Sequence, residues 1–179
     1  MLEIENSCLV IVDVQGKLAQ LMYDKDTLFK NIRILIQAAK ELSIPILWCQ
    51  QVPEALGPTI PEIAELLGGI QPINKSAFNC CGDEKFNGAL QKLGRQQILL
   101  CGIETHVCIY QTAMDLKKQG KDVHVIADAV SSRMLENKQL ALEKLKTYGI
   151  DIDCVEMVLF ELLKTVLHPS FKSIARLIK

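Results

Sequence analysis

Cys108 occupies a position at which a thiol can act as a nucleophile. It closes the run Gly-Ile-Glu-Thr-His-Val-Cys at 102–108, between an apolar strand pattern at 97–101 and a helical pattern at 105–119. Unpaired backbone N–H groups and the positive end of the helix dipole lie at a helix start, and both favour thiolate over thiol. The same N–H groups could stabilise an oxyanion if the sulfur attacked a carbonyl. We therefore predict that Cys108 is a nucleophile whose ionised form is favoured.

A base and a cation for this thiol stand at the ends of two other strand patterns. Asp13 ends the first apolar run and Lys75 ends a short strand pattern at 72–75. A carboxylate beside a thiol can accept its proton, and an ammonium group near both favours the ionised forms. Each residue also has a simpler interpretation, the acid as a helix cap or loop anchor and the lysine as a solvated side chain. The combination of the three at strand ends favours a catalytic set of Asp13, Lys75 and Cys108.

Strand and helix patterns alternate along the whole chain and predict how these side chains are positioned. Apolar runs of strand length lie at 9–14, 46–49, 72–75, 97–101, 123–127 and 152–155. Helical patterns lie at 28–42, 62–67, 83–93, 105–119 and 136–148, and two short helical pieces flank His168. Apolar strands separated by amphipathic helices are typical of a parallel sheet covered on both faces. We predict a single α/β domain over 1–179, with a doubly wound, mainly parallel six-stranded sheet in a Rossmann-like three-layer sandwich.

Ligands of such sheets bind beyond the carboxyl ends of the strands. The polar residues expected at these ends are Asp13, Gln15, Gln50, Gln51, Lys75, residues 104–108 and Asp128.

Composition narrows the classes of function. Of 179 residues, 49% are hydrophobic and 23% are charged, and the net charge of −1 argues against a nucleic-acid partner. No apolar run approaches the roughly 20 residues that span a bilayer, and the first residues do not resemble a signal peptide. Seven cysteines in such a chain indicate a reducing compartment, so we expect a cytoplasmic protein. Adjacent Cys80 and Cys81 form a poor chelate and no C-x-x-C occurs, so no zinc site is expected.

Several motifs together resemble the isochorismatase-like cysteine hydrolase family, and most closely its isochorismatase-domain-containing subgroup. The motifs are Val-Asp-Val-Gln at 12–15, Asn-Lys-Ser-Ala-Phe at 74–78, the run at 102–109 and Asp-Ala-Val-Ser-Ser-Arg at 128–133. A Gln-Gln-Val-Pro segment followed by Leu-Gly-Pro-Thr at 50–59, and a His-Pro-Ser-Phe-Lys tail at 168–172, resemble the subgroup in particular.

This resemblance implies a Cys-Asp-Lys triad of Cys108, Asp13 and Lys75. The family's sulfur attacks a carbonyl or related carbon, commonly of an amide, and the thioester-type intermediate is then hydrolysed. The resemblance also implies a cis peptide bond between Ile103 and Glu104, with the N–H groups of Glu104 and Cys108 forming the oxyanion hole. It further implies a small-molecule substrate and a homo-oligomer, a dimer or larger.

Departures from other branches of the family concern the substrate. Where nicotinamidase-like members carry an Asp-x-His metal pair, this chain has Gln50-Gln51-Val52, and it has three histidines in all. We therefore expect no catalytic metal and no cofactor. The cysteine itself points away from vinyl-ether cleavage, because siderophore-pathway isochorismatases lack it, and toward hydrolysis of a C–N bond.

Five residues are candidates for the substrate pocket. Glu104 would disfavour an anionic substrate by repulsion, although its side chain could instead turn to solvent. His106 could line the pocket or make a structural hydrogen bond, and His124 is expected to be only a strand position. The full set of candidate pocket residues is Gln15, Gln50, Phe78, Glu104 and His106.

Two alternatives stay open: a non-catalytic binding or scaffold protein on the same fold, and a vinyl-ether hydrolase. A receiver domain is disfavoured because one acid, rather than an acidic pair, follows the first strand. A nucleotide-binding Rossmann domain is disfavoured because neither G-x-G-x-x-G nor a P-loop follows any strand.

Overall fold

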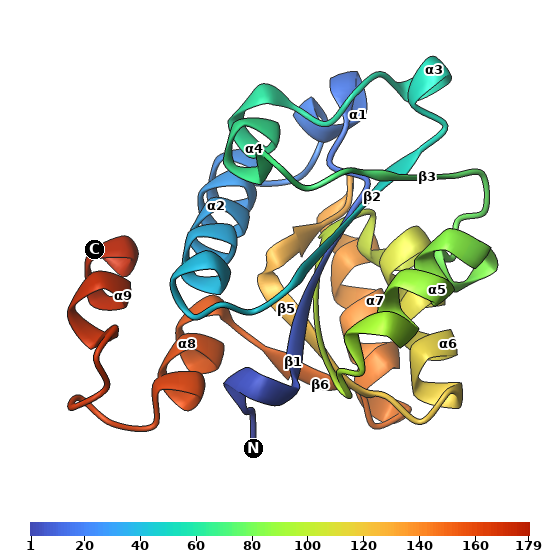
Figure 1. Cartoon of the computed structure of the whole chain (residues 1–179). Coiled ribbons are helices and arrows are strands. Elements are labelled where there is room, and N and C mark those ends of the chain that lie inside the picture. The colour runs from blue at the N-terminus through green and yellow to red at the C-terminus, as the bar shows by residue number, and fades with distance from the viewer.

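The computed structural model describes residues 1–179 as a six-stranded parallel sheet between two layers of helices (Figure 1). The strand order is β3-β2-β1-β4-β5-β6, and every neighbouring pair is parallel. The strands are β1 (Ser7–Val12), β2 (Ile46–Gln51), β3 (Ile73–Lys75), β4 (Gln97–Ile103), β5 (Asp122–Ser131) and β6 (Asp151–Asp153). The predicted doubly wound α/β fold is confirmed.

Helices bury their apolar faces against both sides of this sheet. One side packs with α1 (Gly16–Gln20), α2 (Lys25–Glu41), α4 (Pro61–Ala64), α8 (Val155–Leu163) and α9 (Phe171–Ile178). The other side packs with α5 (Glu84–Leu93), α6 (Tyr110–Lys118) and α7 (Leu135–Thr147). The remaining short elements are η1 (Ile4–Asn6), α3 (Pro53–Leu56), η2 (Glu65–Leu67), η3 (Cys80–Gly82) and η4 (Thr105–Ile109).

The central strand β1 shows why both sides must be covered. Its alternate residues point to opposite faces, so Leu9 and Ile11 join the core beneath α2, while Val10 and Val12 join the core beneath α5 and α6. All six residues of β1 are buried. A strand with apolar side chains on both faces is stable only between two helical layers.

The structure differs from the sequence-based prediction in three places. Strand β5 continues to Ser131, so Asp128 lies within the strand, where its Oδ1 accepts a hydrogen bond from Val155 N at 2.9 Å. The prediction that Asp128 stands at a strand end is therefore wrong, because Ala129 and Val130 extend the buried apolar run. Two short helices, α1 and α3, also form in segments for which no helix was predicted.

The strand order places a switch point between β1 and β4, and the two strands approach closely there. Gly102 of β4 lies against Val12, with φ +120°, and an added Cβ would meet the Val12 carbonyl oxygen at 2.1 Å. Only glycine fits this contact. No helix combines the length and apolar character needed to cross a membrane.

Candidate active site

Three side chains predicted from the sequence come together at the carboxyl edge of the sheet. Asp13 follows β1, Lys75 ends β3, and Cys108 lies in η4, which follows β4. Lys75 Nζ and Asp13 Oδ2 form an ion pair at 2.6 Å, with side chains 0% and 3% exposed. Cys108 is also buried, at 8%, and lies close enough to Asp13 that each group shifts the pKa of the other.

The backbone around Asp13 fixes the direction of its carboxylate. Asp13 adopts a left-handed conformation with φ 55°, and its N–H donates to the Cys49 carbonyl at 3.1 Å. Aspartate tolerates this conformation better than most residues, which suits the turn between β1 and α1. Asp13 Oδ1 has no hydrogen-bond partner, although it is buried. One carboxylate oxygen is therefore held by Lys75 and the other is free to accept a proton.

Lys75 is held by more acceptors than the carboxylate alone. Its Nζ donates to Gln51 Oε1 at 2.7 Å and to the carbonyls of Ala77 and Phe78, each at 3.1 Å. Gln51 is itself fixed, because its Nε2 donates to the Ser76 carbonyl at 2.7 Å. Gln51 was expected only at a strand end, and its role as a second acceptor for Lys75 was not anticipated. Its register opposite Lys75, which the sequence alone does not give, explains the contact.

Burial and charge pairing act in opposite directions on the Asp13–Lys75 pair. Burial raises the pKa of Asp13 above its usual value, and the Lys75 ammonium only partly offsets this. Burial works to lower the pKa of Lys75, but the Asp13 carboxylate, through its charge and its hydrogen bond to Lys75 Nζ, raises it. The lysine therefore stays charged, and the carboxylate becomes a stronger base than a solvated aspartate.

The predicted preference of Cys108 for the thiolate is wrong for the site as it stands. Burial raises the pKa of the Cys108 thiol well above its usual value, the Asp13 carboxylate raises it further, and Lys75 only partly compensates. A buried anion next to another anion costs more than a helix start recovers. Cys108 is therefore a neutral thiol at neutral pH, and it needs a proton acceptor before it can attack.

The segment that carries Cys108 is a single π-helical turn. Residues Thr105–Ile109 form η4, and α6 continues from Tyr110, in place of one regular helix. The peptide bond between Ile103 and Glu104 is cis, and the Glu104 carbonyl accepts from the N–H groups of Val107 and Ile109. π-helical turns are rare and frequently occur at functional sites.

Two candidate pocket residues have their polar atoms engaged in the scaffold. Gln15 is fully buried; its Oε1 accepts from Gln51 N at 2.6 Å, and its Nε2 donates to the carbonyls of Gln51 and Gly57. Gln50 Nε2 donates to Thr59 Oγ1 at 2.9 Å. These bonds tie the end of β2 to the loops that follow β1 and α3. The ring of Phe78, a third candidate, is 56% exposed.

Glu104 is not turned to solvent. It is 8% exposed, and its Oε1 accepts from the Arg133 N–H at 3.0 Å and from Arg133 Nε at 3.1 Å. The guanidinium offsets the charge that was expected to repel an anionic substrate. Arg133 was seen in the sequence only as part of a motif, since nothing in the spacing of 104 and 133 shows that the two residues meet.

His106 makes a structural contact and also borders a cavity. Its Nδ1 lies 2.9 Å from Ser132 Oγ. The cavity, of about 220 Å³, is lined by His106, Tyr110, Asn137, Leu140, Ala141 and Lys144. Asp13, Lys75 and Cys108 are not among its walls, although His106 shares the η4 turn with Cys108.

Comparison with known proteins gives consistent matches over nearly the whole chain. The Isochorismatase domain model matches residues 7–156. Isochorismatase domain-containing protein 2 of Danio rerio is 36% identical over 178 residues, covering 99% of this chain and 89% of that protein.

Two solved structures share the fold. One, described as the MAR1 ribonuclease from Caenorhabditis elegans, superposes with a TM-score of 0.93 at 35% identity, over 99% of this chain and 91% of that one. The other, the YcaC gene product of Escherichia coli, is described as an octameric hydrolase of unknown specificity. It has a TM-score of 0.93 at 23% identity, over 99% of this chain and 88% of that one.

Proposed function

The chain belongs to the isochorismatase family, whose fold is that of hydrolases. On this basis we propose that it is a metal-independent cysteine hydrolase of small amide-like substrates. Cys108 acts as the nucleophile, Asp13 as the general base and acid, and Lys75 as the cation that holds Asp13. The observation that carries the proposal is the buried ion pair of Lys75 and Asp13 next to a buried thiol at the switch point of the sheet.

The first half of the reaction transfers an acyl group to sulfur. Asp13 Oδ1, which has no partner, accepts the proton of the Cys108 thiol as the sulfur attacks the carbonyl carbon. The N–H groups of Glu104 and Cys108 stabilise the oxyanion that forms. The C–N bond then breaks, the Asp13 proton passes to the leaving nitrogen, and a thioester remains on Cys108.

The second half returns the enzyme to its starting state. Asp13 accepts a proton from water as the water oxygen attacks the thioester, and the C–S bond breaks. The carboxylic acid leaves, and the proton held by Asp13 passes back to the sulfur. The neutral resting thiol suits this cycle, because the proton that Cys108 loses to the leaving nitrogen is replaced, through Asp13, by one from water.

A screen of small amides, ureas and carbamoyl compounds tests the proposal. We expect turnover of at least one of these compounds, an acyl adduct on Cys108 by intact mass, and loss of both in Cys108→Ala. Cys8→Ala is the matched control, since Cys8 is also a buried cysteine, at the opposite end of β1, with a pKa raised to about 12. Equal turnover by Cys108→Ala and wild type would reject the nucleophile. Absence of turnover on every compound would favour the non-catalytic alternative.

Two other activities are less well supported. Cleavage of a vinyl ether, the isochorismate-type reaction, does not require a thiol nucleophile, so it leaves Cys108 unexplained. Cleavage of RNA, suggested by the name of the C. elegans relative, calls for a basic surface, whereas this chain has a net charge of −1.

We also propose that the protein assembles as a homo-oligomer. Large apolar side chains are exposed in the last third of the chain, among them Met157, Phe160, Val166 and Leu167. Apolar side chains that are exposed together are typical of surfaces between subunits. Light scattering during gel filtration should give a mass at least twice that of one chain, and a monomer mass would reject the assembly.

A further inference from the structure

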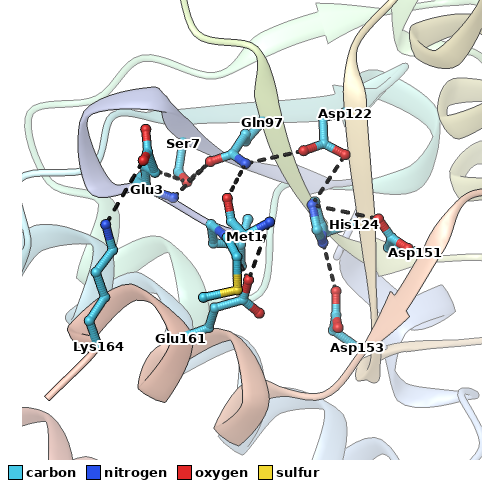
Figure 2. Close-up of polar contacts among 11 residues, drawn as sticks. Met1, Glu3, Ser7, Gln97, Asp122, His124, Asp151, Asp153, Glu161 and Lys164 are labelled. Atoms are coloured by element: carbon cyan, nitrogen blue, oxygen red, sulfur yellow. Dashed lines mark hydrogen bonds and ion pairs between the residues drawn. The ribbon is translucent and has the colours of Figure 1, made fainter.

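A second cluster of ionisable side chains lies at the amino ends of β5 and β6, at the opposite end of the strands from Cys108 (Figure 2). Asp122 and His124 alternate on β5, and Asp151 and Asp153 alternate on β6. His124 pairs in register with Asp151. Because alternate residues of a strand share a face, all four side chains project from the same face of the sheet.

The His124 imidazole is buried and is held from one side only. The residue is 6% exposed, and its Nδ1 lies 2.8 Å from Asp153 Oδ2. When the imidazole is neutral, a carboxylate at this distance favours the ring proton on Nδ1, and the lone pair then lies on Nε2. His124 Nε2 is buried and has no hydrogen-bond partner. Histidines that bind metals show the same arrangement, in which one ring nitrogen donates to a carboxylate and the other faces the ion.

Two further carboxylates face the free nitrogen. His124 Nε2 lies 3.4 Å from Asp122 Oδ1 and 4.0 Å from Asp151 Oδ2, and the three ligand atoms all lie within 4.8 Å of one another. Metal bonds of about 2.0–2.2 Å place neighbouring ligand atoms about 3.0–3.5 Å apart, so the separation of His124 and Asp122 fits an ion and Asp151 must come closer. Small movements of the Asp151 side chain, which is 65% exposed, are enough to close the set around an ion.

The Asp122 carboxylate is oriented by Gln97, on the side away from His124. Gln97 Nε2 donates to Asp122 Oδ2 at 3.1 Å and to the Met1 carbonyl at 2.9 Å, so that Asp122 Oδ1 is the oxygen that faces His124 (Figure 2). The Asp122 side chain is 47% exposed, which leaves a path from solvent and room for water ligands. Three carboxylates around one imidazole leave an excess of negative charge that a divalent cation balances.

We propose that Asp122, His124 and Asp151 bind one divalent transition-metal ion, with Asp153 and Gln97 orienting the ligands. One imidazole nitrogen and two carboxylate oxygens suit ions such as Mn²⁺ and Zn²⁺. The ion would join β5 to the edge strand β6, far from the Asp13–Lys75 pair. This site is separate from the catalytic metal that the sequence led us to doubt, and it does not depend on the proposed hydrolase activity.

Metal titration of the chelator-treated protein tests the site. Mn²⁺ is the first probe, because cysteine sulfur prefers softer ions. Its binding is measured by electron paramagnetic resonance at mildly alkaline pH, at which the imidazole ligand is neutral. Zn²⁺ is the second probe, followed by equilibrium dialysis and elemental analysis. We expect one equivalent bound by wild type, and binding about 10–100-fold weaker in Asp153→Asn, which removes the carboxylate behind the histidine. Asp151→Asn should weaken binding at least as much.

His168→Gln is the matched control, since it removes a histidine outside the cluster and should bind as wild type does. The ion should also raise the melting temperature of wild type and of this control, but not that of Asp151→Asn. Asp151 is exposed, so this variant keeps its fold and the test does not rest on the buried His124. The proposal is overturned if neither ion binds stoichiometrically, or if both aspartate variants bind as tightly as wild type.

Discussion

The two ends of the parallel sheet both gather charged side chains, but they balance the charge in different ways. At the carboxyl end, one carboxylate and one ammonium group pair at 2.6 Å and are almost completely buried. At the amino end, three aspartates surround one buried imidazole, and Asp122 and Asp151 remain in contact with water. Burial is complete only where opposite charges match one to one, because an unmatched buried charge is too costly.

The largest effect on stability is expected when the Asp13–Lys75 ion pair at the carboxyl end of the sheet is broken. Lys75→Met keeps most of the side-chain volume but leaves the Asp13 carboxylate buried without its cation. We expect the free energy of unfolding to fall by about 3–5 kcal/mol, as measured by urea denaturation. In the double variant Lys75→Met, Asp13→Asn part of this loss should be recovered, because no charge is then left unpaired. A loss below about 1 kcal/mol in the single variant would show that the pair is not a buried charge match.

The second largest effect is expected from Asp13→Asn, which tests whether Asp13 accepts the proton of Cys108. Asp13→Asn should lower turnover by at least about 100-fold, because the general base is lost. The same change should slow alkylation of Cys108 by iodoacetamide at a fixed pH, because the neutral thiol loses the carboxylate that accepts its proton as the sulfur attacks. Peptide mapping after timed alkylation measures this rate, with Cys101, which is fully buried, as the internal reference.

Two results for Asp13→Asn would contradict this prediction, and each has its own meaning. Unchanged turnover would remove Asp13 from the mechanism. Faster alkylation of Cys108 would show that Asp13 acts on the thiol only through its charge, which raises the pKa of Cys108, and not as a proton acceptor.

The sequence also predicted more of the site at the carboxyl end of the sheet than of the cluster at its amino end. Asp13, Lys75 and Cys108 could be predicted to lie together, because each stands at a strand end and parallel strands end at one edge. The pKa direction of Cys108 could not, since it depends on burial and on the distance to Asp13. Gln51 and Arg133 were missed for a similar reason, because their contacts depend on strand register and on the path of the chain after β5.

At the amino end the sequence showed only half of the cluster. His124 lies in the strand pattern predicted at 123–127 and Asp122 directly precedes that pattern, but a polar residue at each of these positions is typical of many strand ends. Asp151 and Asp153 belong to the three-residue strand β6 at 151–153, whereas the expected strand at 152–155 begins one residue later and ends two residues later. A one-residue change of register exchanges the faces of a strand, so the meeting of the four side chains could not be predicted.

The pH profile of turnover tests the carboxyl end again. Asp13 must be ionised to accept a proton, so kcat/KM should fall as the pH falls through its pKa. Burial raises this pKa above the ordinary value of 3.8, and the midpoint of the acid limb should therefore lie above 3.8. The residual activity of Asp13→Asn should lack this limb. A wild-type limb at or below the ordinary value would mean that Lys75 outweighs burial at Asp13.

The smallest effect is expected from charge removal at the amino end. Asp151→Asn, measured without metal and in the presence of a chelator, removes a carboxylate that is 65% exposed and 4.0 Å from His124 Nε2. Water already screens this charge, so the free energy of unfolding should change by less than about 0.5 kcal/mol. The result is to be compared with that of Lys75→Met, because both variants remove one charge from a cluster of ionisable groups at an end of the same sheet. A loss of several kcal/mol in Asp151→Asn would mean that His124 and its aspartates form a tightly matched charge cluster like Asp13 and Lys75, and the excess negative charge that favours a bound cation would then be absent.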